Sequence, residues 1–195
     1  MKIHDSIIQG SEEWFALRLA RFTASDAQAI ASNGAGLTTL VYEKAAEKLT
    51  GKTKDSYSND DMLRGKELEA LARSAYEIES GQAVKTTGFI ELNEFAGASP
   101  DGLLGEKGLL EIKNPNAANF VKFMYERKID TKYKWQTQMQ LYVSGREWVD
   151  FVVHHPDFQK PLIITRIERD PEAIKKIEIG LSQGIAKLRE ILAKV

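Results

Sequence analysis

The sequence predicts an α/β fold in which a mixed β-sheet is flanked by helices. Three observations predict it: helical hydrophobic periodicity over residues 11–81, strand-like hydrophobic runs over 83–115, and a return to helices, strands and one long amphipathic helix after them. At 195 residues and 43% hydrophobic, the chain can bury one sizeable core. We therefore expect a single domain over residues 1–195.

The first two elements expected are helices. Ser11, followed by two glutamates, is suited to be the N-cap of a helix over residues 11–22. A second short helix is expected over 23–31, with Ser25 as its N-cap and Gln28 completing a capping box. The glycines of "GAGL" then interrupt the chain.

Two longer helices should follow over residues 38–51 and 60–81, each ending on a glycine. The polar stretch 52–58 between them is expected to be a mobile loop. The elements expected after Gly81 are, in order, strands over 83–92, 96–104 and 108–115, helices over 117–127 and 132–145, and strands over 147–155 and 161–169.

A long amphipathic helix closes the chain, with Asp170 as its N-cap and Pro171 in its first turn. Its apolar positions keep helical spacing: Ile174, Ile177, Leu181, Ile185, Leu188 and Ile191. We expect this stripe to cover the sheet, and a contact between subunits is the alternative.

Composition excludes several kinds of site. Without cysteine there are no disulfides, thiolate zinc sites or cysteine-ligated iron–sulfur clusters, so a metal must be held by oxygen or imidazole. No signal-peptide pattern or 18-residue apolar run occurs, and we expect a cytoplasmic protein with no membrane partner. The net charge is −1, but residues 107–134 carry seven Lys/Arg against three Asp/Glu, a local basic excess.

The stretch "SPDGLLGEKGLLEIK" combines residue types that phosphodiester hydrolysis requires. Asp101 and Glu111 are carboxylates that can hold Mg²⁺, and Lys113 can supply positive charge near the reacting oxygens. Glu111 and Lys113 are two apart on a strand, so they share a face while Ile112 points to the core. An exposed ion pair on a surface hairpin is the alternative reading.

The register of this hairpin decides whether Asp101 joins the site, because a one-residue slip moves a side chain to the other face. A five-residue connection over 104–108 places Asp101 opposite Glu111. A four-residue turn over 105–108 points Asp101 away, unless a bulge near Pro100 redirects it. The catalytic hypothesis requires the first register or the bulge.

These residues resemble a known family. "SPDG" followed by "EIK" looks like the PD-(D/E)xK nuclease core, and three further stretches are similar to motifs of the phage lambda exonuclease family, the YqaJ-like viral recombinases: "WFALRLARFTASDA", "RGKELEALA" and "YKWQTQMQLYVSG". The resemblance spans residues 14–145. It implies a restriction-endonuclease-like PD-(D/E)xK fold.

The resemblance also implies an activity. Members digest one strand of linear double-stranded DNA from 5′ to 3′, release 5′-mononucleotides and leave a 3′ single strand for phage-type recombination. It implies Mg²⁺, with Mn²⁺ as a substitute and two ions per site. It further implies DNA ends as substrate, preferably 5′-phosphorylated, a homotrimeric ring, and a single-strand annealing protein as partner.

Site residues carried over from the resemblance fall into two groups. Asp101, Glu111, the Ile112 carbonyl and Glu69 would hold the metal, Lys113 would orient the attacking water, and Gln136 would lie near it. Helical periodicity does not separate Gln136 from Gln138. Arg18, Ser25 and Ser99 would bind the terminal 5′-phosphate, and a helix beginning at Ser25 would add backbone N–H groups.

Two acids near these groups carry separate expectations. Asp26 is unfavourable beside a phosphate, so its carboxylate should point away. Glu91, on the strand before Asp101, could reach the metal cluster, where some relatives have an aspartate.

Simpler interpretations exist for most of these residues. Glu69 stands four residues before Arg73, which suits an ordinary helix ion pair. The glutamines at 136, 138 and 140 can form a plain polar face, and Trp14, Trp135 and Trp148 are most simply core residues. Lys122, Arg127, Lys128, Lys132 and Lys134 are either a solvated face or a DNA path.

Two rival functions remain at this stage. One is a PD-(D/E)xK endonuclease that cuts DNA internally. The other is a non-catalytic scaffold that binds DNA ends in recombination and keeps the fold without turnover.

Overall fold

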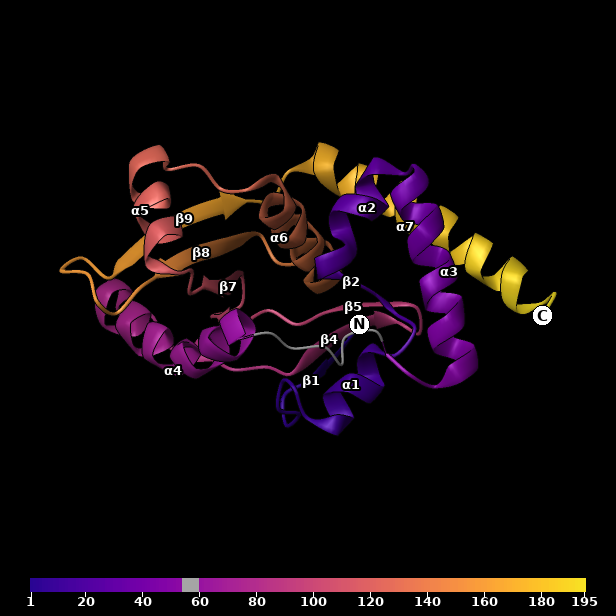
Figure 1. Ribbon diagram of the computed structural model, residues 1–195, viewed down its shortest axis with the longest axis horizontal. Helices are drawn as coiled ribbons and strands as arrows, with labels where there is room; N and C mark the ends of the chain where they lie inside the picture. The colour runs from indigo at the N-terminus through magenta and orange to yellow at the C-terminus, as the bar shows by residue number, and fades with distance from the viewer. Residues whose placement is uncertain (54–59) are drawn as a thin grey trace.

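The computed structural model describes residues 1–53 and 60–195, with side chains described over 1–53 and 67–195. The expected mobile loop at 52–58 therefore lies largely outside the described residues. Within them, the strands form two sheets (Figure 1). One sheet has the order β1-β4-β5-β2: Lys2–His4, Phe89–Asn93, Ala96–Ala98 and Phe22–Thr23. The other has the order β3-β6-β7-β8-β9: Val84–Lys85, Gly102–Leu104, Gly108–Lys113, Trp148–His154 and Leu162–Glu168.

Both sheets are mixed, as the predicted fold class requires. In the five-stranded sheet β7 and β8 run parallel, and the other neighbours are antiparallel. The division into two sheets was not expected. The expected strands 83–92 and 96–104 each break in the middle and give one strand to each sheet. Pro100 lies in the second break, where the missing N–H of proline cannot donate to a neighbouring strand.

The later helices follow the expected ranges, but the first and the third do not. The helix expected over 11–22 ends at Arg18, because Phe22 pairs with Ala96 in β2, and the third helix begins at Ala35, within the stretch expected to interrupt the chain. The bounds of the helices are α1 Glu12–Arg18, α2 Ala27–Ser32, α3 Ala35–Thr50, α4 Asp60–Ser80, α5 Ala117–Glu126, α6 Thr131–Ser144 and α7 Pro171–Leu192. Ser11 caps α1 by accepting from the Trp14 N–H, and Asp170 caps α7 by accepting from Glu172 and Ala173. Gly51 ends α3 in the left-handed conformation, as the glycine signal indicates.

The predicted N-cap at Ser25 is wrong. A 3-10 turn, η1 (Ala24–Asp26), precedes α2, and its cap is Thr23. The Asp26 carboxylate accepts from the Thr23 backbone N–H at 2.8 Å and from its hydroxyl at 3.0 Å. Thr23 closes strand β2, where pairing with Gly97 holds the backbone extended, so the turn begins two residues earlier than the serine signal indicates.

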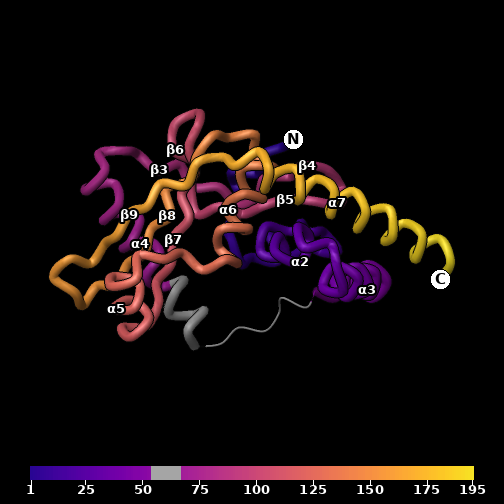
Figure 2. The backbone as a smooth tube through the Cα atoms, turned by 90° about the horizontal axis from the view of Figure 1, so that it is seen from above, coloured from indigo at the N-terminus to yellow at the C-terminus, as the bar shows by residue number. Residues whose placement is uncertain are grey.

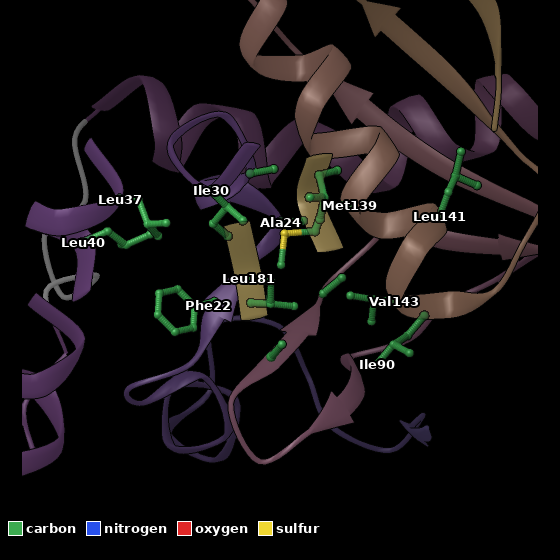
Figure 3. Packing of buried hydrophobic residues seen from close by; sticks show 14 of the residues in the cluster. Phe22, Ala24, Ile30, Leu37, Leu40, Ile90, Met139, Leu141, Val143 and Leu181 are labelled. Atoms are coloured by element: carbon green, nitrogen blue, oxygen red, sulfur yellow. The ribbon is translucent and has the colours of Figure 1, made fainter. Parts of the chain in front are cut away.

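Helix α6 joins the two sheets. Its residues Met139, Leu141 and Val143 pack in one core cluster with Ile90 of the first sheet and Leu109 of the second (Figure 3). This helix therefore has a fixed place over both β4–β5 and β7, which matters for the polar residues that it carries.

The apolar stripe of α7 packs mainly against helices rather than against the sheet. In Figures 1 and 2, α7 runs alongside α2 and α3. Ile177, Leu181 and Leu188 are buried in the same cluster as Ile30 and Leu37. The stripe is buried as expected, but the prediction that it covers the sheet is wrong. Periodicity identifies the buried face of a helix and does not show which elements pack against it.

Helices α4 and α5 lie at the end of the molecule opposite the C-terminus of α7 (Figures 1 and 2). A buried polar network fastens α4 to the five-stranded sheet. Asp150, 3% exposed, accepts from the Tyr76 hydroxyl at 2.7 Å and from Arg166 at 2.9 and 3.0 Å. Burial and the Asp150 carboxylate raise the pKa of Tyr76, which keeps this donor protonated.

No helix in residues 1–53 and 60–195 combines the length and the apolar content that a membrane crossing requires.

The close approach of α7 to α2 depends on Gly180. A Cβ added there would lie 1.9 Å from the Ile30 carbonyl oxygen, which is backbone and cannot move aside easily. We expect Gly180→Ala to lower the free energy of unfolding by about 1–3 kcal/mol, measured by urea denaturation. Gly184→Ala is the matched control, since its Cβ would meet only the side chains of Leu37 and Phe22, at 3.1 and 3.2 Å. Equal stability of the two variants would contradict this account.

Candidate active site

The β6–β7 hairpin has the register that the catalytic hypothesis requires. Gly102 pairs with Leu110 and Leu104 with Gly108, so Asp101 falls opposite Glu111. The Asp101 N–H donates to the Leu110 carbonyl at 3.0 Å, which extends the pairing. Pairing also runs one step further toward the turn than expected, so residues 105–107 alone form the connection.

Glu111 is the most enclosed acid of this hairpin, with 2% of the residue exposed. Its Oε1 accepts from Lys113 Nζ at 2.5 Å and from Gln136 Nε2 at 2.6 Å, and its Oε2 accepts from Gln140 Nε2 at 2.6 Å. Three donors around a buried carboxylate offset the loss of water and hold the group in one orientation.

Asp101 completes a pair of close carboxylates. Its Oδ2 accepts from the Ile112 backbone N–H at 2.6 Å. Burial, then the charges of Glu111 and Glu69, raise the pKa of Asp101 well above its usual value, and Lys113 opposes them. For Lys113, burial favours the neutral amine, but Glu111 and Asp101 outweigh it and raise its pKa, so an ammonium is held at the site.

Glu69 reaches the site from α4. It lines the same cavity as Asp101 and Lys113, and its carboxylate accepts from Arg73 at 2.5 Å. The helix ion pair with Arg73, the simpler interpretation of Glu69, is therefore present. Glu69 also lies near Asp101, so the ion pair and a place at the acidic site are compatible.

The residues present fit a divalent cation of the magnesium type. Among the described side chains, no group of three or more acids and histidines is already gathered as a metal cluster. The donors are instead two carboxylates, Asp101 and Glu111, and Ile112, whose carbonyl the resemblance adds to the set, lines the same cavity as Asp101. Mg²⁺ prefers oxygen ligands and keeps several waters, so one or two carboxylates per ion suffice. A cation would oppose the burial and the Glu111 charge, which together raise the pKa of Asp101.

The glutamines of α6 divide between two tasks. Gln136 and Gln140, one turn apart, both donate to Glu111. Gln138 faces elsewhere: its amide donates to the Glu168 carbonyl at 2.8 Å and accepts from the Asp170 N–H at 2.9 Å. Gln140 was missed by the sequence reasoning, although its i, i+4 spacing from Gln136 placed both on one helix face.

Arg18 and Ser99 meet on Trp14. The indole Nε1 of Trp14 donates to Ser99 Oγ at 2.9 Å, and the Arg18 guanidinium lies 4.3 Å from the centre of the Trp14 rings. Ser25 is exposed, and its hydroxyl shares a 2.9 Å hydrogen bond with Thr23. Trp14 is half-buried and belongs to none of the core clusters, so the interpretation of Trp14 as a core residue is wrong; its spacing of four residues from Arg18 is a signal that could have indicated this contact.

Two further acids have partners of their own. The Asp26 carboxylate binds Thr23, and burial raises its pKa while Lys44 and Arg18 oppose the shift. Glu91 accepts from His4 and Arg21, each at 2.9 Å. Glu91 therefore forms an ionic cluster with His4 and Arg21 at the four-stranded sheet.

A cavity of about 840 Å³ opens beside the acidic pair. Glu69, Asp101, Ile112 and Lys113 line one part of it. Residues 114–116, α5, the start of α6, the residues between these helices, and two residues of β8 line the rest. Three of the five basic residues singled out in the sequence belong to its lining: Lys122, Lys128 and Lys132. Tyr133 stands between the two regions, with the Lys113 and Lys132 ammonium groups 4.9 and 4.7 Å from its ring centre.

Solved structures resemble the whole chain. An alkaline exonuclease, LHK-Exo, from Laribacter hongkongensis is 37% identical, with 94% of this chain and 95% of that chain covered and a TM-score of 0.87. The structure of LHK-Exo in complex with dAMP matches with the same values. A phage related exonuclease from Haemophilus somnus 129PT shares the fold at 19% identity, with 89% and 96% covered and a TM-score of 0.68. No curated protein sequence compared with the chain matches it.

The family model of the YqaJ-like viral recombinase domain matches residues 13–147, well over half of the chain. That span includes the Trp14–Arg18–Ser99 cluster, the acidic hairpin and the glutamines of α6. The fold is the restriction-endonuclease-like PD-(D/E)xK fold of the exonuclease structures. The chain belongs to the YqaJ-like viral recombinase family, the phage lambda exonuclease family that its motifs resemble.

Proposed function

We propose that this protein is a magnesium-dependent exonuclease that digests one strand of linear double-stranded DNA from 5′ to 3′. It releases 5′-mononucleotides and leaves a 3′ single strand for phage-type recombination. The observation that carries the proposal is the buried Glu111 carboxylate, bound by Lys113 and set opposite Asp101, where Asp101 and Lys113 line a cavity that also contains Lys122, Lys128 and Lys132. Family membership and the exonuclease relatives support nuclease activity on DNA.

The chemistry assigned to the site follows from its charges. Asp101, Glu111 and the Ile112 carbonyl would hold Mg²⁺, or Mn²⁺ in its place, with Glu69 as a further acid. Two such ions, when bound, would stabilise the attacking and leaving oxygens of the phosphodiester. Lys113 remains an ammonium and directs an N–H toward the attacking water, while Gln136 fixes the shared Glu111 oxygen.

The Arg18, Ser25 and Ser99 side chains would receive the terminal 5′-phosphate. Arg18 is suited to a two-pronged contact with phosphate oxygens, and Trp14 braces both Arg18 and Ser99. Ser99 stands two residues before Asp101, so a phosphate held there is close to the acidic pair. This arrangement supports digestion from an end rather than internal cutting.

Assembly completes the proposal. The family resemblance supports a homotrimeric ring around the DNA and a single-strand annealing protein as partner in recombination. Light scattering measures the subunit number, and a strict monomer would remove the ring from the proposal.

Lys113→Ala tests the reaction itself. Loss of the ammonium should reduce the release of nucleotides from 5′-phosphorylated linear duplex in Mg²⁺ by about 10²- to 10³-fold, because charge developing in the transition state loses its donor. Lys107→Ala is the matched control, a lysine of the same hairpin that is exposed and pairs with Glu147 at 3.0 Å. Digestion by Lys113→Ala at the wild-type rate would refute the assignment. Binding without Mg²⁺-dependent release by the wild type would favour a scaffold.

Arg18→Lys tests the end pocket. A lysine keeps the charge but loses the planar fork, so the rate ratio between 5′-phosphate and 5′-hydroxyl ends should fall by about tenfold. Arg189→Lys is the control, since Arg189 also stacks on an aromatic ring, Phe95, at 4.6 Å. Closed circular DNA should stay intact with all three proteins. Cutting of the closed circle would instead favour an endonuclease.

The double substitution Lys128→Gln and Lys132→Gln tests the cavity as a DNA path. Binding of duplex, measured without divalent cation, should weaken, and the slope of log affinity against log salt should become shallower by about 0.9 for each DNA phosphate that the protein no longer neutralises. Lys175→Gln with Lys176→Gln makes the same charge change on exposed residues of α7. An equal reduction of affinity in both double variants would show that net charge alone is responsible.

A further inference from the structure

Gln140 contacts Glu111, but the proposed reaction assigns no role to Gln140. It is 1% exposed, and its Nε2 lies 2.6 Å from Glu111 Oε2. An ionised carboxylate only accepts hydrogen bonds, so Gln140 must turn its NH₂ group toward Glu111. Lys113 and Gln136 both donate to the other oxygen, Oε1. Among the described residues, Gln140 is the side chain that donates to Oε2.

The other end of the Gln140 amide shows what this interaction costs. Its Oε1 is buried and has no hydrogen-bond partner among the residues that the structure describes. A buried carbonyl without a partner is unfavourable, and an apolar side chain of similar size would avoid the penalty. The hydrogen bond to Glu111 is therefore the polar interaction, within the described part of the chain, that accounts for a glutamine at this position.

Gln138 provides a contrast on the same helix. It is 6% exposed, and both ends of its amide are used, toward the Glu168 carbonyl and the Asp170 N–H. It fastens α6 to the junction between β9 and α7. Gln138 and Gln140 are thus two buried glutamines on one helix, and Gln140 is the one that touches the acidic pair.

We propose that Gln140 is a positioning residue for divalent-cation binding: by holding Oε2, it keeps the Glu111 carboxylate turned toward Asp101. This inference rests on the proposed function, because it assigns Gln140 to the metal ligand of that reaction. A carboxylate offers about four lone-pair sites, so the three donors leave room for a cation. Without Gln140, Oε2 loses its donor, and the carboxylate is held only through Oε1, by Lys113 and Gln136.

The test is cation affinity of the DNA-free protein. Mn²⁺ titration by calorimetry compares the wild type with Gln140→Met, which keeps the length of the side chain and removes the donor. We expect the Mn²⁺ dissociation constant to rise about 10- to 100-fold, the usual effect of losing a group that orients a metal ligand. Gln138→Met, the matched control, should change it less than about twofold, since Gln138 does not touch Glu111.

Two further measurements separate positioning from folding. Thermal unfolding checks that each variant is native at the titration temperature, and Gln140→Asn, too short to reach Glu111, serves as a second variant with the same expected loss. In digestion assays, the Gln140 variants should need about 10- to 100-fold more Mg²⁺ for half-maximal rate, while the KM for duplex ends stays at the wild-type value.

The possible results separate the two proposals. Wild-type Mn²⁺ affinity in both Gln140 variants, or an equal loss in Gln138→Met, would overturn the role of Gln140 while leaving the exonuclease proposal in place. Failure of the wild-type protein to bind Mn²⁺ or Mg²⁺ at all would overturn the proposed function, and this inference with it.

Discussion

The burial of one carboxylate is the constraint on which the rest of this structure depends. Glu111 sits on a central strand with 2% of its surface exposed, and a charge in that position is tolerable only when donors replace the water it has lost. One donor comes from its own strand, Lys113, and two come from α6. Helix α6 must therefore lie over β7 in one rotational setting, and the same setting brings its apolar residues into the core between the two sheets.

The reverse face of β7 supports the same arrangement. Leu110 and Ile112 pack there with Ala72, Tyr76 and Val152, so the residues between the polar ones hold α4 against the sheet. The Tyr76–Asp150–Arg166 network adds direction to that packing, because hydrogen bonds specify an orientation where hydrophobic contact does not. Glu69, two turns before Tyr76 on α4, owes its place beside Asp101 to this anchoring.

Local patterns were sufficient for the alternation of side chains along β7 and for two of the three N-caps that the sequence indicated. Alternation along a strand put Glu111 and Lys113 on one face, and only two hairpin registers had to be weighed for Asp101. The N-caps at Ser11 and Asp170 were also predicted correctly. Pairings between distant segments could not be predicted in this way. Strands β1 and β2 are only three and two residues long, and the strands with which they pair lie far along the chain. The N-cap prediction at Ser25 was wrong, and Gln140 was missed, for the same reason. Strand β2 determines where the turn at Thr23 begins, and the distant Glu111 determines what Gln140 binds.

The break between β5 and β6 has a consequence for scale. It carries Ser99 and Asp101 on one short piece of backbone that cannot stretch beyond about 7 Å, whereas a DNA strand advances about 3.4 Å per nucleotide. In the proposed reaction, this fixed length of backbone would set the distance between the bound 5′-phosphate and the phosphodiester bond to be hydrolysed. The size of the released product would then depend on the geometry of the protein chain and not on the identity of the bases.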